Sequence, residues 1–158
     1  MKKGEEAECC PKFKPKKWDK KTVVWKKKAF VKDRYFSAFH IPLNLGSIIK
    51  KNCKKIEAEK DEAENFIMLC DEKSPFHSNI YFSVKKPIEG VHDVRVSGTF
   101  LTKVFEGPYK NMKAWKKEME EYVKSKNKEI KNMLYYYTTC PDCAKKYGKN
   151  YVVLFAEI

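Results

Sequence analysis

The stretch VRVSGTFLTKVFEGPY at residues 94–109 decides the fold class of this chain. Apolar and polar residues alternate along it as far as Phe105, and this period of two predicts a β-strand. Gly107 and Pro108 break the strand, because both residue types are typical of turns. Beyond the turn, apolar residues recur at helical spacing as far as Val123. The stretch therefore predicts a long strand that leads into an amphipathic helix.

The same order of elements is found twice along the chain, at about 35–85 and at about 94–158. In each part a strand leads into an amphipathic helix, and two further strands follow. Strands that follow each other closely pair as antiparallel hairpins, and amphipathic helices need a sheet face on which to pack. We therefore predict an α+β fold in which duplicated strand–helix–strand–strand modules form an antiparallel sheet with two helices on one face.

The N-terminal part differs from the rest of the chain in composition. The chain has 158 residues, which is enough for one domain of ordinary size. Residues 1–28 contain 11 Lys against 4 acidic residues, and the isolated Trp18 and Trp25 follow neither a helical nor a strand period. We therefore predict a basic N-terminal arm at residues 1–30 and a single domain at residues 31–158.

The charge and hydropathy of the chain narrow the classes of partner. The net charge is +13, and 42% hydrophobic residues exclude a wholly disordered chain. Arginine, which is preferred for bidentate contacts to phosphate and guanine, occurs only at Arg34 and Arg95, so nucleic acid is disfavoured as the main partner. No apolar run is long enough to span a bilayer, and the first residues do not resemble a signal peptide. We therefore expect a cytoplasmic protein without a membrane partner.

The last strands carry bulky residues on both faces of the predicted sheet. Tyr135 and Tyr136 point to opposite faces because side chains alternate along a strand, whereas the helices cover one face. Two structural explanations account for the second face: the arm lies across it with Trp18 and Trp25, or the chain, otherwise a monomer, forms a homodimer there. The functional explanation is an aromatic groove that binds a small hydrophobic or cationic molecule.

Glu106 is the candidate catalytic residue. It ends a strand just before a helix, where a carboxylate beside an apolar groove is suited to general acid–base catalysis. The alternative is a structural role, because the helix dipole favours a glutamate near a helix start. A lone histidine at the equivalent junction of the first half is more often structural than functional. The candidate ligand-binding residues are His40, Phe100, Tyr109, Tyr136 and Phe155.

The six cysteines leave the chemistry of one motif open. Disulfide bonds are disfavoured because the sequence shows no export signal. Cys140 and Cys143 form a Cys-x-x-Cys motif between two strands, whereas a redox pair has a helix after its first cysteine. The remaining interpretations are reduced thiols without a ligand, or a structural zinc ion held by Cys140, Cys143 and the Cys10 thiol. No other cofactor is predicted.

The break FEGPY at residues 105–109, together with the duplicated order of elements, resembles the GyrI-like (gyrase-inhibitor-like) small-molecule-binding domain. The segments TKVFEGPY at 102–109 and TCPDCAKKYG at 139–148 are similar to stand-alone members that are usually labelled hydrolase. The resemblance implies a groove between the two halves for a hydrophobic, cationic or electrophilic ligand. Relatives often place a carboxylate on a late strand of this groove, whereas the strand LYYYT at 134–138 has none.

Two functions follow from the residues and the resemblance together. The first is a GyrI-like protein that binds a small aromatic, cationic or electrophilic compound in a tyrosine-rich groove, with hydrolysis of that compound as a further step. In that case Glu106 would be the acid–base group. The alternative is a non-catalytic module that sequesters a ligand or docks nucleic acid through its lysine-rich arm.

Overall fold

The computed structural model describes residues 13–39, 41–58, 67–72, 74–86, 88, 90–138 and 148–158. Strands are named β, α-helices α and short 3-10 helices η. In chain order the elements are η1 (Pro15–Lys17), β1 (Lys21–Ala38), β2 (Ile41–Pro42), α1 (Leu45–Ala58), β3 (Met68–Asp71), β4 (His77–Ser83), β5 (Asp93–Glu106), η2 (Tyr109–Asn111), α2 (Met112–Ser125), β6 (Asn132–Tyr137) and β7 (Tyr151–Glu157).

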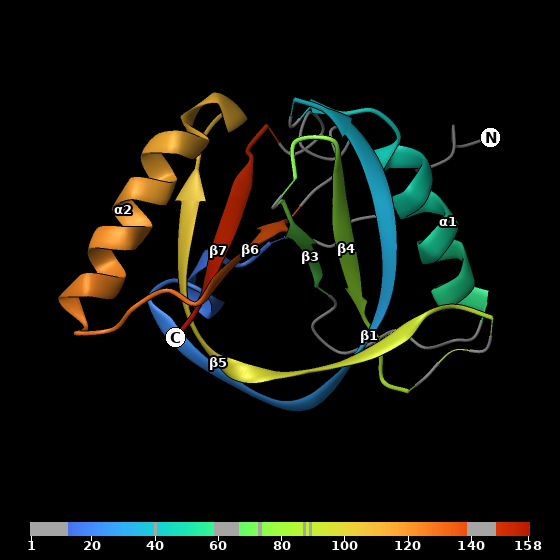
Figure 1. Cartoon of the computed structure of the whole chain (residues 1–158), viewed down its shortest axis with the longest axis horizontal. Coiled ribbons are helices and arrows are strands. Elements are labelled where there is room, and N and C mark those ends of the chain that lie inside the picture. Colours follow the sequence, from blue (N-terminus) through green and yellow to red (C-terminus); the bar gives the residue numbers. More distant parts are fainter. Residues whose placement is uncertain are drawn as a thin grey trace, which may run out of the picture.

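Six of the described strands close into an antiparallel barrel (Figure 1). The neighbours around it are β1, β4, β3, β6, β7 and β5, and β5 pairs again with β1. β2 extends the sheet beside the end of β1. The structure therefore confirms the predicted α+β fold with an antiparallel sheet. The closure of that sheet into a barrel is not in the prediction, and the duplication of the modules stays a prediction.

Strand β1 closes the barrel because both of its halves pair with another strand. The second half pairs with β4 between Phe30 and Phe36, and the first half pairs with β5 from Lys21 to Val31. Residues 21–30, which the sequence assigns to a separate arm, are therefore the first half of β1.

A bulge in β1 explains why this strand is hidden in the sequence. The register with β5 shifts between Trp25 and Lys28, and Lys27 has a positive φ of 50°. Because the bulge moves the inward-facing positions from odd to even numbers, Trp25 and Phe30 pack in the same cluster. The backbone N–H of Lys27 donates to the Ser97 Oγ at 2.9 Å and so holds the bulge against β5. The alternation of apolar and polar residues is therefore interrupted within this strand.

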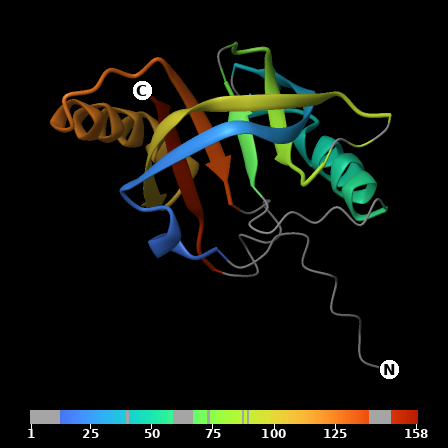
Figure 2. The same cartoon turned by 90° about the horizontal axis from the view of Figure 1, so that it is seen from below.

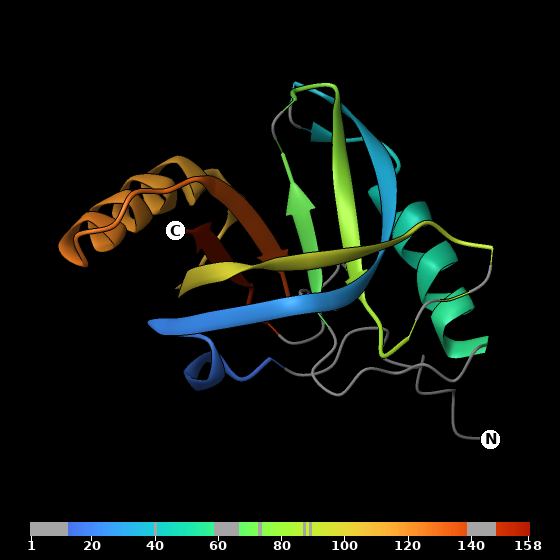
Figure 3. The ribbon, with the colours of Figure 1, turned by 60° about the horizontal axis from the view of Figure 1, so that its bottom comes forward.

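Aromatic side chains fill the interior of the barrel. The buried apolar residues that the structure describes form two clusters. Both helices contribute to one of them, so the other, which is rich in aromatic rings, is the inner cluster. The ring centroid of Trp25 lies 4.9 Å from that of Phe100 and 5.6 Å from that of Phe155, while Trp18 lies 5.4 Å from Phe155. Figures 2 and 3 show the first half of β1, in blue, crossing the side of the molecule that is lowest in Figure 1. Tryptophans of the chain itself therefore cover the second face of the sheet.

The two helices pack on the outer surface, at opposite sides of the barrel (Figure 1). On α2, Trp115 and Met119 are buried one turn apart, and the Trp115 ring stacks on Phe105 at 5.6 Å. This confirms that the apolar stripe of the second helix is core. On α1, the Asn52 side chain donates to Asp33 Oδ2 at 2.8 Å and ties the helix to β1. Within the described residues, neither helix has the length and hydropathy that are needed to cross a membrane.

Gly107 joins β5 to η2 with a backbone conformation that favours glycine. Its φ is 139°, its N–H donates to the Asn150 carbonyl oxygen at 3.0 Å, and a Cβ here would lie 3.4 Å from both Trp115 and Asn111. We expect Gly107→Ala to lower the free energy of unfolding by about 1–3 kcal/mol in urea denaturation, because the new side chain strains the turn. The control is Gly46→Ala in α1, where a Cβ meets nothing within 4 Å and helix propensity favours alanine. Equal stability of the two variants would contradict the strain at Gly107.

Candidate functional site

Four polar side chains meet on the outer face of the barrel, between the strands that carry α1 and α2. They are Tyr35 from β1, Cys70 from β3, Glu72 from the residue after β3, and Tyr137 from the end of β6. The phenol of Tyr137 donates a hydrogen bond to Glu72 Oε1. β3 and β6 are neighbouring strands at the centre of the part of the barrel that carries these residues (Figure 1). We call these four residues the Glu72 cluster.

Tyr35 and Cys70 form the buried part of the Glu72 cluster. The Tyr35 side chain is 1% exposed, and its hydroxyl forms hydrogen bonds with Ser78 and Cys70. Burial raises the pKa of Tyr35, and burial together with the charge of Glu72 raises the pKa of the Cys70 thiol. Both groups therefore stay protonated at neutral pH. Cys70 is not a thiolate nucleophile, because nucleophilic cysteines have lowered pKa values.

Glu72 is the charged group of the cluster. Burial raises the pKa of Tyr137, and the negative charge of Glu72 raises it further. The Tyr137 phenol therefore stays protonated and serves as a hydrogen-bond donor. A carboxylate that is held by a neutral phenol and has a second oxygen to offer is suited to accept a proton from water.

Aromatic side chains form the walls around Tyr137. The Tyr109 ring of η2 meets the Tyr137 ring edge-on at 5.5 Å, and the Tyr135 ring stacks on it at 6.5 Å. The Lys116 ammonium of α2 lies 5.1 Å from the centroid of the Tyr135 ring and hydrogen-bonds with the Tyr135 phenol. Burial raises the pKa of Tyr135. The polar centre is thus flanked by rings from η2 and β6.

A pocket of about 460 Å³ adjoins this aromatic wall between α2 and β6. Tyr135 and Lys116 belong to both the wall and the pocket. The volume falls in the range of sites for small molecules. The lining residues are Lys116, Glu120, Val123, Lys124, Lys128, Glu129, Ile130, Met133 and Tyr135.

The residues chosen from the sequence are found in different parts of the molecule. Tyr109 is the one that lies beside the Glu72 cluster. Glu106 is the exposed last residue of β5 and is paired with Tyr151 of β7. The others in the described part of the chain, Phe100, Tyr136 and Phe155, are packed in the barrel interior beside Trp18 and Trp25 and do not line an open groove. His40 lies outside the described residues.

The cysteines proposed as zinc ligands, Cys10, Cys140 and Cys143, also lie outside the described residues. Within the described ranges, no group of three or more His, Cys, Asp or Glu side chains is placed to hold a metal ion. The structural zinc ion stays a prediction.

The sequence does not show that Glu72, Tyr35 and Tyr137 lie together, because they belong to or follow three different strands. One feature of the sequence does indicate Glu72. Met68, Cys70 and Glu72 alternate on one face of a short buried strand, so that a carboxylate continues an apolar row. A charged residue at such a position is unusual, because burial of an unpaired charge is costly.

The family model described as "Bacterial hydrolase" matches residues 1–158 of the chain. No curated protein matches this chain. The resemblance to the GyrI-like domain stays a prediction. The match extends over the whole chain, and it therefore includes every strand of the barrel and every residue of the Glu72 cluster. This chain therefore belongs to the bacterial hydrolase family.

Proposed function

We propose that this protein hydrolyses a small, partly apolar molecule at the Glu72 cluster, with Glu72 as the general base. The observation that carries the proposal is the hydrogen bond from the Tyr137 phenol to Glu72 Oε1, beside the rings of Tyr109 and Tyr135 on the outer face of the barrel. The name of the family supports hydrolysis as the type of reaction.

The roles of the residues follow from their protonation states. Glu72 accepts a proton from a water molecule while the water oxygen attacks an electrophilic carbon of the substrate, and that proton then passes to the leaving group. Tyr137 holds the carboxylate in place through its phenol. Tyr35 is buried and its hydroxyl forms hydrogen bonds with Ser78 and Cys70, so it supports the cluster and does not contact the substrate.

The rings beside the Glu72 cluster indicate the class of substrate. Tyr109, Tyr135 and Tyr137 offer ring faces and edges, which favour flat apolar groups and cations. The adjoining pocket has room for a substituent of the substrate along α2. A neutral or cationic aromatic molecule with an ester or strained-ring electrophile combines these features.

The first experiment is a turnover assay on p-nitrophenyl esters of increasing acyl length and on an aryl epoxide, in isotopically labelled water. We expect hydrolysis of at least one of these classes, with one labelled oxygen in the product. Binding of the aromatic compounds without any turnover would contradict hydrolysis and leave the non-catalytic alternative.

Tyr137→Phe separates the positioning role of the phenol from a purely structural one. We expect turnover to fall by about ten- to a hundredfold, because a hydrogen bond to a charged group is lost. The control is Tyr122→Phe on α2, whose phenol lies near Asp19. Equal rates for both variants would contradict the role of Tyr137.

A further inference from the structure

Four large apolar side chains are exposed together where β1 ends and β4 begins. Phe36 is 59% exposed, Phe39 79%, Leu43 67% and Phe76 57%. The Phe39 and Phe76 rings contact each other at 5.8 Å, and backbone hydrogen bonds join Leu43 to Phe36 and Phe76 to Ser37, so the four residues lie close together. We call these four residues the aromatic tip. Contiguous exposed apolar patches on a folded protein mark surfaces that interact with something else.

The backbone of the aromatic tip is held by hydrogen bonds, although its side chains are exposed. The Phe36 N–H donates to Asn44 Oδ1 at 2.7 Å, and the Leu43 N–H donates to the Phe36 carbonyl oxygen at 2.9 Å. The Ser37 N–H donates to the Phe76 carbonyl oxygen at 2.8 Å. The apolar side chains are therefore presented by an ordered backbone and are not the product of a frayed strand end.

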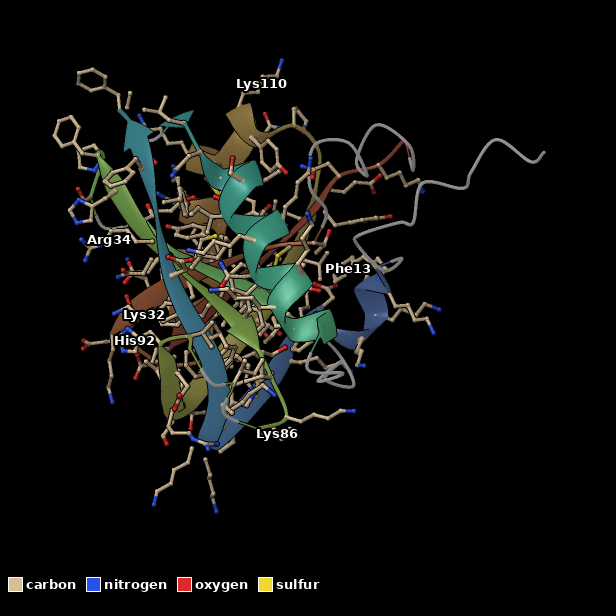
Figure 4. All side chains as sticks on the ribbon, turned by 90° about the vertical axis from the view of Figure 1, so that its right-hand side faces the viewer. Phe13, Lys32, Arg34, Lys86, His92 and Lys110 are labelled. Carbon is tan, nitrogen blue, oxygen red and sulfur yellow. The ribbon has the colours of Figure 1, made fainter. Side chains whose placement is uncertain are left out.

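The two segments of the chain that carry the aromatic tip are basic. The segments 34–50 and 74–86 contain no Asp or Glu, whereas they include Arg34 and Lys50. Arg34 is exposed two residues before Phe36, and Figure 4 shows Arg34 and Lys32 along one edge of the molecule. Of the acidic residues before these segments, Asp33 accepts a hydrogen bond from Asn52 and Glu72 accepts one from Tyr137.

We propose that the aromatic tip docks this protein on the surface of an anionic lipid bilayer. Phenylalanine and leucine side chains insert at the boundary between headgroups and acyl chains, while basic residues beside them are attracted to anionic headgroups. The net charge of +13 adds to this attraction. Single-stranded nucleic acid also binds to aromatic and basic residues, but it needs a groove that follows the strand. The aromatic tip includes the aliphatic side chain of Leu43, which offers no ring for base stacking, and this favours lipid.

The position of the aromatic tip connects it to the Glu72 cluster. Tyr35 precedes Phe36 on β1 and is paired with Ser78 of β4, two residues after Phe76. Docking of the tip therefore brings the Glu72 cluster close to the bilayer. This suits an apolar substrate that is dissolved in lipid. Docking itself does not depend on hydrolysis, so each proposal can fail without the other.

The test is flotation of the full chain with vesicles of phosphatidylcholine, alone or mixed equally with phosphatidylglycerol. We expect binding to the mixed vesicles and little binding to phosphatidylcholine alone. In the combined variant Phe36→Ser, Phe39→Ser and Phe76→Ser, we expect the affinity for mixed vesicles to fall about tenfold or more. The control is Val24→Ser, because Val24 is also 59% exposed but lies in the first half of β1, away from the tip.

A second variant reports insertion directly. We expect Phe39→Trp to gain fluorescence quenching by brominated lipids over the three native tryptophans. Circular dichroism shows that each variant is folded before it is compared. The proposal is overturned if mixed vesicles do not bind the protein, or if the triple variant binds as well as the Val24→Ser control. It is also overturned if the tip variants abolish binding of a single-stranded oligonucleotide or a concentration-dependent dimer while vesicle binding is unchanged.

Discussion

Replacing Glu72 with glutamine is expected to lower the rate of hydrolysis by about 10²- to 10⁴-fold, which is the range for loss of a general base. Glutamine preserves the shape of the side chain and can still accept the hydrogen bond from Tyr137, so the fold around the site is retained. It cannot take a proton from water. The measurement is kcat and kcat/KM on the best ester or epoxide of the assay, and we expect the loss in kcat because the proton moves in the transition state.

Glu106→Gln is the matched control, because Glu106 is the carboxylate that the sequence alone favours. It is exposed at the end of β5, and we expect its replacement to leave kcat within about twofold of the native value. A large loss with Glu106→Gln and none with Glu72→Gln would reverse the assignment. Equal losses in the two variants would show that neither is the single base.

Phe155→Ala is expected to lower the free energy of unfolding by about 3–5 kcal/mol, because it leaves a cavity in the centre of the barrel. The Phe155 side chain is fully buried, and its ring contacts those of Trp18, Trp25, Phe100 and Tyr136. These neighbours come from β1, β5, β6 and the turn before β1, so the surrounding rings are fixed by different strands and relax little. The measurement is the urea midpoint and slope at equilibrium.

The control for this prediction is Val24→Ala, whose side chain is exposed on the same closing strand. We expect it to change stability by less than about 0.5 kcal/mol. A small effect of Phe155→Ala would mean that the interior is open enough to collapse or to admit a ligand. In that case the barrel interior would be the ligand-binding groove that the sequence predicts.

Much of the fold is predictable from residue patterns, because strands and helices have local periods. The alternation that ends at Phe105 and the Met112 to Val123 stripe identify β5 and α2, and both are present in the structure. Closure of the barrel is not predictable in this way. It depends on the bulge between Trp25 and Lys28, which interrupts the alternation, and on pairing of β1 with a strand that is distant in sequence.

The candidate site is less predictable than the fold, because it depends on which strands are neighbours. Glu106 stands out in the sequence because a strand, a turn and a helix meet there. Glu72 stands at the end of a short strand, and its partner Tyr137 is 65 residues away. The alternation of Tyr135 to Tyr137 predicts two faces but cannot assign them. The aromatic tip is hidden for the same reason, since its residues belong to strand ends that are separate in the sequence.

The pairing of β1 with β5 has a consequence for synthesis of the protein on the ribosome. Lys21 is paired with Thr102, and β5 is in turn paired with β7, which ends at Glu157. β1 is the first strand to be synthesised, and its inner rings are therefore covered only after nearly the whole chain has been made. Contacts between such distant residues slow folding and expose apolar surface in the meantime. A stalled chain that lacks β7 is then a natural client for chaperones that bind exposed aromatic segments.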